Sequence, residues 1–197
     1  ISTFTRQKLS QKIAIVRQEF VPVFGFTVIE TVMMARTIHF GATGFESSRD
    51  RELVNQALIA TDTERFASRQ LASLSGGERQ LVFIARALAQ NTDILLLDEP
   101  TSFLDLKHQV DIYDLLKKLQ EEQGKTIIAV THDINLAAQY ADFILLLGPD
   151  NSNIYGPVTD TLSANTIEKV FGVRTFSGTI REGKFFMPLG KFAKDKL

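Results

Sequence analysis

The sequence predicts an α/β fold in which a parallel β-sheet is flanked by helices and a helical segment is inserted between strands. Short apolar runs alternate with amphipathic helical patterns along most of the 197 residues. This alternation is typical of a parallel sheet with helices on its faces. The composition, with 44% hydrophobic and 23% charged residues, is that of an ordinary globular protein.

The first expected strand is Ile13–Val16, a β-branched run that ends close to Gln18. Apolar residues then recur with helical spacing over Val28–Phe40 and again over Arg49–Thr61. We expect these two helices to form the inserted segment.

The middle of the chain contains the strongest strand and helix signals. Ile94–Leu97 is continuously apolar, which predicts a buried parallel strand rather than a half-exposed one. The expected order is a helix at Ser75–Gln90, a strand at Asp93–Asp98, a helix at Lys107–Gln123 closed by Gly124, buried strands at Thr126–Val130 and Phe143–Leu147, a short helix at Asn165–Val170 and a β-hairpin over Thr175–Met187.

Charge and cysteine content exclude some classes of partner and site. The net charge is −1 and Lys and Arg are scattered, so no basic stripe favours nucleic acid as a partner. The absence of cysteine excludes disulfides and thiolate metal sites and fits a reducing compartment. The longest apolar runs are far shorter than the roughly 20 residues that span a bilayer. We therefore expect a chain that does not cross a membrane by itself and lies in the cytoplasm.

The string Leu74–Gln80 (LSGGERQ) carries more than a helix start. Ser75 and Glu78 have the spacing of a capping box, which alone explains an N-terminus. It does not explain Gly76 and Gly77, because glycine in a first helical turn is useful where a ligand must come close. A hydroxyl, two bare amides and a helix dipole together form a site suited to a terminal phosphate.

Two adjacent carboxylates end the strand at 94–98. One carboxylate there is commonly just solvated, but Asp98 and Glu99 lie at the carboxyl edge of a parallel strand, where α/β folds place ligands. Asp98 can hold Mg²⁺, usually through water, and Glu99 can polarise an attacking water as general base. The pair therefore predicts a metal-dependent hydrolytic site.

These strings resemble the motifs of ABC transporter ATPases. LSGGERQ is similar to the ABC signature motif, and Asp98 with Glu99 resembles a Walker B aspartate and the catalytic glutamate. The run Thr101–Asp105 resembles the D-loop, which crosses the dimer interface in that family, and this implies a nucleotide-site role for Asp105. Phe103 departs from the small residue more usual at its position.

Two further residues take their roles from the resemblance. His132 follows an expected strand and so ends at the same sheet edge as Glu99, where it resembles the family's switch histidine, which contacts the γ-phosphate. Gln18 precedes the helical insertion and resembles the Q-loop glutamine, whose amide reaches Mg²⁺ and the attacking water.

The resemblance implies a P-loop NTPase-like fold and an ATP-hydrolysing subunit that uses ATP and Mg²⁺. It implies an ATP-sandwich dimer, either a homodimer or a pseudo-symmetric one, on permease subunits at the cytoplasmic face of the membrane, with a solute-binding protein as an indirect partner. Strings such as 27–36 and 132–137 are most similar to importers of ferric siderophores, haem and cobalamin. The expected parts are 1–18, the end of an N-terminal piece of the catalytic core; 19–87, a helical signature subdomain; 88–158, catalytic core; and 159–197, a C-terminal helix and β-hairpin extension.

The family's P-loop, G-x-x-x-x-G-K-S/T, does not occur in the sequence. In the family it precedes the Q-loop, so we expect an N-terminally incomplete ATPase domain that is inactive as given. Gly178–Lys184 matches the glycines and the lysine, but Phe185 replaces the hydroxyl, no helix can open at Pro188, and Glu182 would repel phosphate. We interpret it as a hairpin turn.

Two other functions remain as alternatives. One is a soluble ABC ATPase of repair or translation that acts on nucleic acid, which the scattered charge disfavours. The other is a non-catalytic interaction module with only part of a nucleotide site. The presence of both Glu99 and His132 favours an enzyme.

Overall fold

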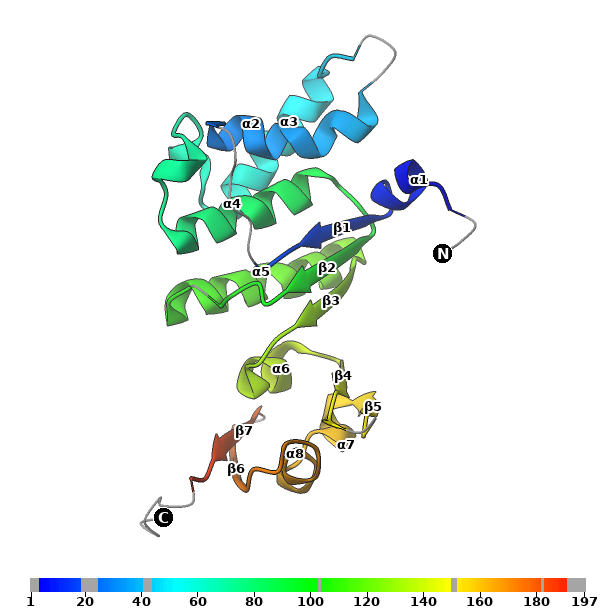
Figure 1. Ribbon diagram of the computed structural model, residues 1–197, viewed down its shortest axis with the longest axis vertical. Helices are drawn as coiled ribbons and strands as arrows, with labels where there is room; N and C mark the ends of the chain where they lie inside the picture. The colour runs from blue at the N-terminus through cyan, green and yellow to red at the C-terminus, as the bar shows by residue number, and fades with distance from the viewer. Residues whose placement is uncertain are drawn as a thin grey trace. The chain divides into compact units, whose positions relative to one another are not determined.

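The computed structural model describes residues 4–18, 25–40, 44–102, 104–149, 152–181 and 183–190 (Figure 1). The chain divides into two units, Ile1–Thr131 and His132–Leu197. Each unit is described by itself. In the part of the chain that the structure describes, no helix has the length and apolar character needed to span a membrane.

The first unit is built on a parallel sheet of three strands in the order β1-β2-β3. β1 is Ile13–Val16, β2 is Ile94–Asp98 and β3 is Thr126–Val130. Because β2 pairs in parallel with both neighbours, all three strands end at one edge. The predicted parallel sheet, with its strand positions, is confirmed.

The prediction that β2 and β3 are buried on both faces is wrong. Along β2, Leu95 and Leu97 are buried in the core that includes α4 and α5, but the neighbouring side chains are only half-buried. On β3, Ile128 is 54% exposed, and Ile15 on β1 is 56% exposed. A continuously apolar strand is buried on both sides only where both faces of the sheet are covered, and the described residues of the first unit cover only one face.

The helical segment begins with α2, Val28–Met33, whose capping box joins Thr27 and Glu30. The expected continuous helix to Phe40 is wrong, because the chain tightens into a 3₁₀ helix, η1, over Met34–His39. The Thr37 hydroxyl donates to the Met34 carbonyl at 2.8 Å, a local bond of the kind that competes with α-helical pairing. The next helix, α3 at Ser48–Ala60, lies where the sequence predicts it.

Helices α4 and α5 match the predicted spans closely. α4, Gly76–Ala89, is capped by Ser75, and its apolar stripe is part of the core. α5, Leu106–Gln123, ends at Gly124 in the left-handed conformation with φ +64°, as the glycine predicts. The shorter helices of this unit, not predicted from the sequence, are α1 (Arg6–Ser10), η2 (Glu64–Phe66) and η3 (Leu71–Ser73).

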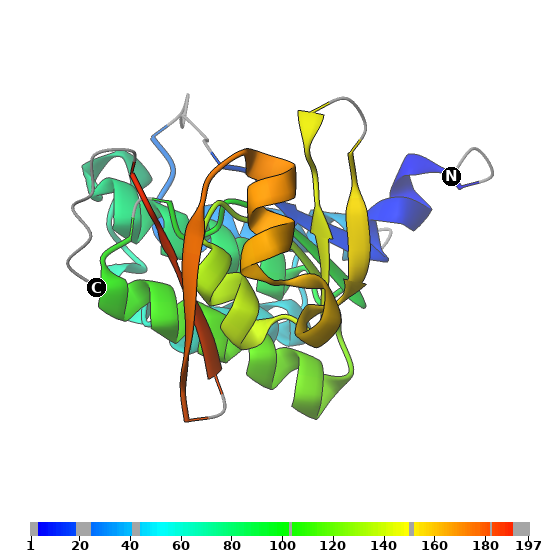
Figure 2. The ribbon, with the colours of Figure 1, turned by 90° about the horizontal axis from the view of Figure 1, so that it is seen from below.

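The second unit packs around the buried side chains of Leu146, Leu162, Ile167, Val170 and Phe186. Its β4, Phe143–Leu146, was expected to join the parallel sheet, and this is wrong. β4 instead pairs antiparallel with β5, because the short connection through Gly148 and Pro149 folds the chain back as a hairpin. The remaining elements are α6 (Ile134–Tyr140), β5 (Ile154–Pro157), α7 (Val158–Thr161), α8 (Ala164–Phe171), and a hairpin of β6 (Thr175–Ile180) and β7 (Gly183–Pro188), which Figure 2 shows as two long paired strands. The predicted short helix and C-terminal hairpin are confirmed.

A buried ion pair joins η1 to α3. Arg36 Nε donates to Asp50 Oδ1 at 2.8 Å, and both side chains are buried. Hydrogen bonds from the hydroxyl and the backbone N–H of Ser47, helped by Arg36, lower the pKa of Asp50 to about 2. A lowered carboxyl pKa stabilises the fold above the unfolded-state pKa, and this contribution is lost as pH falls through the folded-state value.

The free energy of unfolding is therefore expected to fall by about 2 kcal/mol on account of Asp50 as pH drops from about 4 to about 2. Denaturant titrations across this range measure the overall loss. A carbon-13 NMR titration of the Asp50 carboxyl assigns its share, and a midpoint at 3.8 or higher contradicts the prediction.

Candidate active site

The carboxyl edge of the parallel sheet holds the predicted carboxylates. Asp98 is the last residue of β2 and pairs in register with Val130 of β3. Glu99 follows, and its N–H donates to the Val130 carbonyl at 2.9 Å, which fixes its backbone against the neighbouring strand. The Asp98 side chain is exposed and that of Glu99 is half-buried.

Glu99 has a left-handed backbone, with φ +45°. For a residue with a Cβ this conformation costs roughly 1–2 kcal/mol. The Ser102 hydroxyl and N–H both bind the Glu99 carbonyl, at 2.7 and 3.3 Å, and hold the turn. Such strain is most often found where it aims a side chain for function. The sequence carried no sign of it, because glycine, the usual marker of this conformation, is not there.

Gln18 and Glu99 meet although they are far apart in sequence. The Gln18 Nε2 donates to Glu99 Oε2 at 2.6 Å, at the short end for a hydrogen bond from an amide to a carboxylate. This contact is possible because β1 and β2 are adjacent and end at the same edge. The contact holds one carboxylate oxygen of Glu99 in place. The side-chain amide oxygen of Gln18 remains available as an acceptor.

The residues at this edge fit Mg²⁺. Magnesium is usually held by one or two carboxylates together with water and substrate phosphates, not by a full protein cage. The exposed carboxylate of Asp98 and the amide oxygen of Gln18 are ligand atoms of the right kind. Among the described residues, no group of three or more His, Cys, Asp or Glu could hold a metal ion by itself.

The signature string forms the predicted capping box. Glu78 N–H donates to Ser75 Oγ at 3.3 Å, and Glu78 Oε2 accepts from Ser75 N–H at 2.7 Å. Hydrogen bonds from the backbone N–H and the hydroxyl of Ser75 to the carboxylate lower the pKa of Glu78. The Ser75 hydroxyl hydrogen-bonds to the Glu78 carboxylate. The amides of Gly76 and Gly77 belong to the first helical turn, where no intrahelical acceptor exists.

Two guanidinium groups hold the loop that leads into Ser75, and sequence reasoning did not identify them. Arg79 Nη1 donates to the Leu74 carbonyl at 2.5 Å, and Arg69 Nη2 donates to the Ser73 carbonyl at 3.1 Å. A side chain added at Gly76 would meet no atom of the described residues within 4 Å. Two side-chain hydrogen bonds therefore hold the loop that precedes Ser75. The space around Gly76 is open.

Asp105 is the N-cap of α5. Its Oδ1 accepts from the N–H of His108 at 3.0 Å and lies 2.8 Å from His108 Nδ1. These contacts with His108 lower the pKa of Asp105. The carboxylate thus has a structural task, and its predicted part in the nucleotide site stays a prediction. Phe103, the unusual member of this loop, lies outside the described residues.

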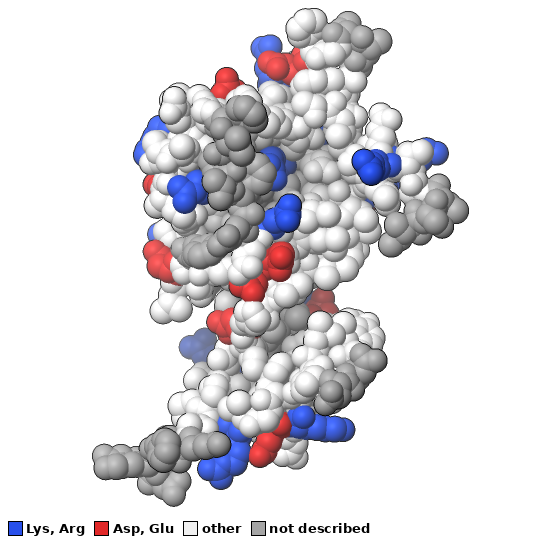
Figure 3. Space-filling view, in the orientation of Figure 1, with Lys and Arg blue, Asp and Glu red and all other residues white. Residues whose placement is uncertain are grey.

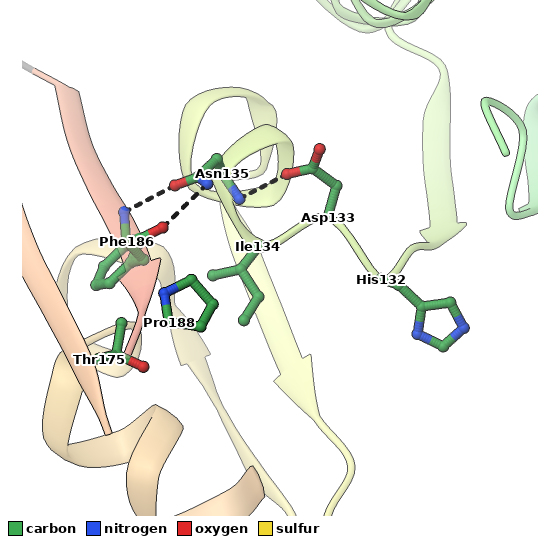
Figure 4. A pocket seen from close by; sticks show the side chains of 7 residues that line it. All are labelled: His132, Asp133, Ile134, Asn135, Thr175, Phe186 and Pro188. Atoms are coloured by element: carbon green, nitrogen blue, oxygen red, sulfur yellow. Dashed lines mark hydrogen bonds between the residues drawn. The ribbon is translucent and has the colours of Figure 1, made fainter. Parts of the chain in front are cut away.

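His132 lies just beyond β3 and is the first residue of the second unit. It lines a pocket together with residues at the start of α6 and residues of the β6–β7 hairpin. In Figure 4 the His132 ring points away from Asn135 and Phe186. Asn135 anchors the start of α6 to β7: its Oδ1 accepts from Phe186 N–H at 2.8 Å, and its Nδ2 donates to Phe186 O at 3.2 Å. The pairing of His132 with Glu99 stays a prediction.

The P-loop look-alike at 178–184 is part of the hairpin. Gly178 is in β6, and a side chain there would collide with the ring of Phe185 on β7, so the glycine has a packing explanation. Lys184 and Phe185 are in β7, where no helix begins. The interpretation as a hairpin is confirmed, although Glu182 lies outside the described residues.

Comparison with known proteins identifies the family. A family model described as ABC transporter matches residues 1–102. The petrobactin import ATP-binding protein FpuC of Bacillus anthracis is 40% identical over 190 residues, which cover 95% of this chain and 69% of that protein. The chain belongs to the ABC transporter family. The resemblance to ABC transporter ATPases is thereby confirmed at the level of the family.

Solved structures support the same fold for this ABC ATPase. An inward-facing structure of a protein assigned as a metal-chelate type ABC transporter matches with a TM-score of 0.84 and 34% identity, over 91% of this chain and 74% of that one. The dimeric bacterial ABC transporter cassette MJ0796 matches with a TM-score of 0.62 and 38% identity, over 72% and 62%. The chain thus spans about two thirds of the length of the relatives it matches.

Proposed function

We propose that this chain is the ATP-hydrolysing part of an ABC importer for iron-siderophore or similar metal-chelate complexes. The contact between Gln18 and Glu99 carries the hydrolytic assignment, because it joins the residue before the helical insertion to the proposed base. The substrate class is supported by a petrobactin import relative and by a metal-chelate type transporter.

In the proposed mechanism Glu99 is the general base that accepts a proton from the attacking water. Gln18 orients the Glu99 carboxylate, and Asp98 with the Gln18 oxygen would hold Mg²⁺, which neutralises phosphate charge. His132 would contact the γ-phosphate and keep the water and Glu99 in register.

The signature serine and glycines act on ATP held by a second subunit. Ser75, Gly76 and Gly77 offer a hydroxyl and two amides at the positive end of α4, which suits a terminal phosphate. Asp105 would lie at the same subunit interface. A homodimer or pseudo-symmetric dimer follows from this arrangement, and the dimeric state of the MJ0796 cassette supports it.

The proposed setting is the cytoplasmic face of a membrane. Residues 19–87 would form the helical subdomain that docks on permease subunits, 1–18 and 88–158 the catalytic core, and 159–197 a C-terminal extension. A solute-binding protein would deliver the metal chelate from the other side. On the face seen in Figure 3, the described charged side chains of both signs are interspersed, which gives no support to a nucleic-acid partner.

Affinity purification of the ATP-hydrolysing protein from membranes is expected to recover a multi-spanning permease and no nucleic acid. The permease complex should also retain a radioactive ferric siderophore when its binding protein is added. Recovery of nucleic acid without any membrane protein contradicts the proposed function and favours the repair or translation alternative. Recovery of a permease that ignores metal chelates contradicts the substrate class alone.

A further inference from the structure

The proposed hydrolytic mechanism does not use the buried ion pair between Arg36 and Asp50. The two side chains are 7% and 6% exposed. Desolvation makes such a pair a weak source of stability compared with apolar side chains of the same size, and buried charges are best explained where they fix one arrangement of the chain. The hydrogen bonds around Arg36 show which arrangement is fixed.

Arg36 binds the far end of the signature helix. Its Nη1 donates to the carbonyl of Ala89 at 3.0 Å and to that of Gln90 at 3.1 Å. These carbonyls close α4, where the last turn has no intrahelical donors and the helix dipole is negative. One guanidinium therefore joins α3, through Asp50, to the C-terminal end of α4.

Gln90 continues the connection into the sheet. Its Nε2 donates to the carbonyl of Ser10, the last residue of α1, at 2.5 Å and to that of Ile13, the first residue of β1, at 3.0 Å. β1 ends close to Gln18, which in turn binds Glu99. Figure 1 shows α4 between α2 and α3 on one side and β1 on the other.

We propose that Arg36 and Gln90 are positioning residues that set the direction of α4 and thereby the place of Ser75. This inference rests on the proposed function of the signature motif. α4 has 14 residues. At 1.5 Å per residue, a tilt of about 10° at its C-terminal end moves its N-terminal end by roughly 3–4 Å. That displacement exceeds the tolerance of a hydrogen bond to phosphate.

The test uses the ATP-hydrolysing protein with two independent changes. Gln90→Leu removes the link to β1 and leaves the ion pair intact. The double change Arg36→Met with Asp50→Asn removes the clamp without burying a lone charge, and the asparagine oxygen can still accept the Ser47 N–H bond in the capping box of α3. Arg49→Met is the matched control, because Arg49 forms an exposed ion pair with Glu52 on the same helix.

Both test variants are expected to bind wild-type amounts of ATP per chain with unchanged affinity. ATP-driven subunit association, measured by sedimentation in a Glu99→Gln background, should weaken by about tenfold or more, and kcat should fall similarly without a change in KM. If the changes only destabilised the fold, the amount of ATP bound per chain would fall by the same factor as kcat. Arg49→Met should match the wild type in every measurement.

Wild-type association and kcat in either folded test variant overturn the proposal. An equal loss in Arg49→Met, or a loss of kcat matched by a loss of bound ATP, does so as well. Failure of both variants to fold assigns the network to folding alone and also overturns it. If the protein without these changes does not hydrolyse ATP, the proposed function fails, and that outcome is separate from the behaviour of the variants.

Discussion

Replacing Glu99 with glutamine is expected to lower ATP hydrolysis by at least about 10²-fold in the ATP-hydrolysing protein, while ATP binding persists. The amide cannot accept the proton of the attacking water. It can still accept the hydrogen bond from Gln18, so the geometry of the sheet edge should be retained. Because hydrolysis releases the dimer, the variant should accumulate as an ATP-bound dimer.

Steady-state phosphate release, ATP binding and sedimentation measure the three parts of this prediction. Glu122→Gln, on the exposed final turn of α5, makes the same chemical change away from the sheet edge and should leave turnover unchanged. Wild-type turnover in the Glu99→Gln variant would remove Glu99 from the role of general base. Loss of ATP binding would assign it to binding instead.

The 197-residue chain tested alone is expected to bind MgATP weakly and not to hydrolyse it. No segment of the sequence has the amides, lysine and hydroxyl of a P-loop in the required order. In the proposed mechanism Ser75, Gly76 and Gly77 would contact nucleotide presented by another subunit, so two chains without a P-loop would have no ATP to present to each other.

Calorimetric titration of MgATP into the 197-residue chain tests this prediction, with sedimentation to detect an ATP-dependent dimer. A version of the protein that carries a P-loop is the positive control and should bind, dimerise and hydrolyse. Micromolar affinity of the 197-residue chain would show that the nucleotide site has been misplaced.

Local signals in the sequence predicted the elements that position the site. The alternation of strands and helices predicted that β1, β2 and β3 run parallel in one sheet, while their spatial order and the contact of Gln18 with Glu99 came from the structure. Ser75 with Glu78, and Gly124, marked helix ends through short-range hydrogen bonds and backbone conformation, which depend on neighbours in sequence. Such features can be predicted because their causes are local.

The features that were not predicted depend on contacts between distant residues. Arg36 is ordinary in the sequence, and its role appears only when Asp50 and the end of α4 are placed around it. The left-handed backbone conformation of Glu99 could not be predicted, because the position is not a glycine. Whether the apolar side chains of β3 are covered depends on the elements that pack against them, and the sequence of the strand alone does not determine these elements.

Strand β3 has a practical consequence for handling the 197-residue chain. It is the last strand of its three-stranded sheet, its sequence TIIAV has no charge and no proline, and Ile128 and Val130 are more than half exposed. Strands of this kind template pairing with other chains, and natural proteins usually protect them with charges, bulges or a covering segment. At high concentration β3 can pair with the same strand of another chain and start aggregation. The solubility of the chain therefore depends on what covers these five residues.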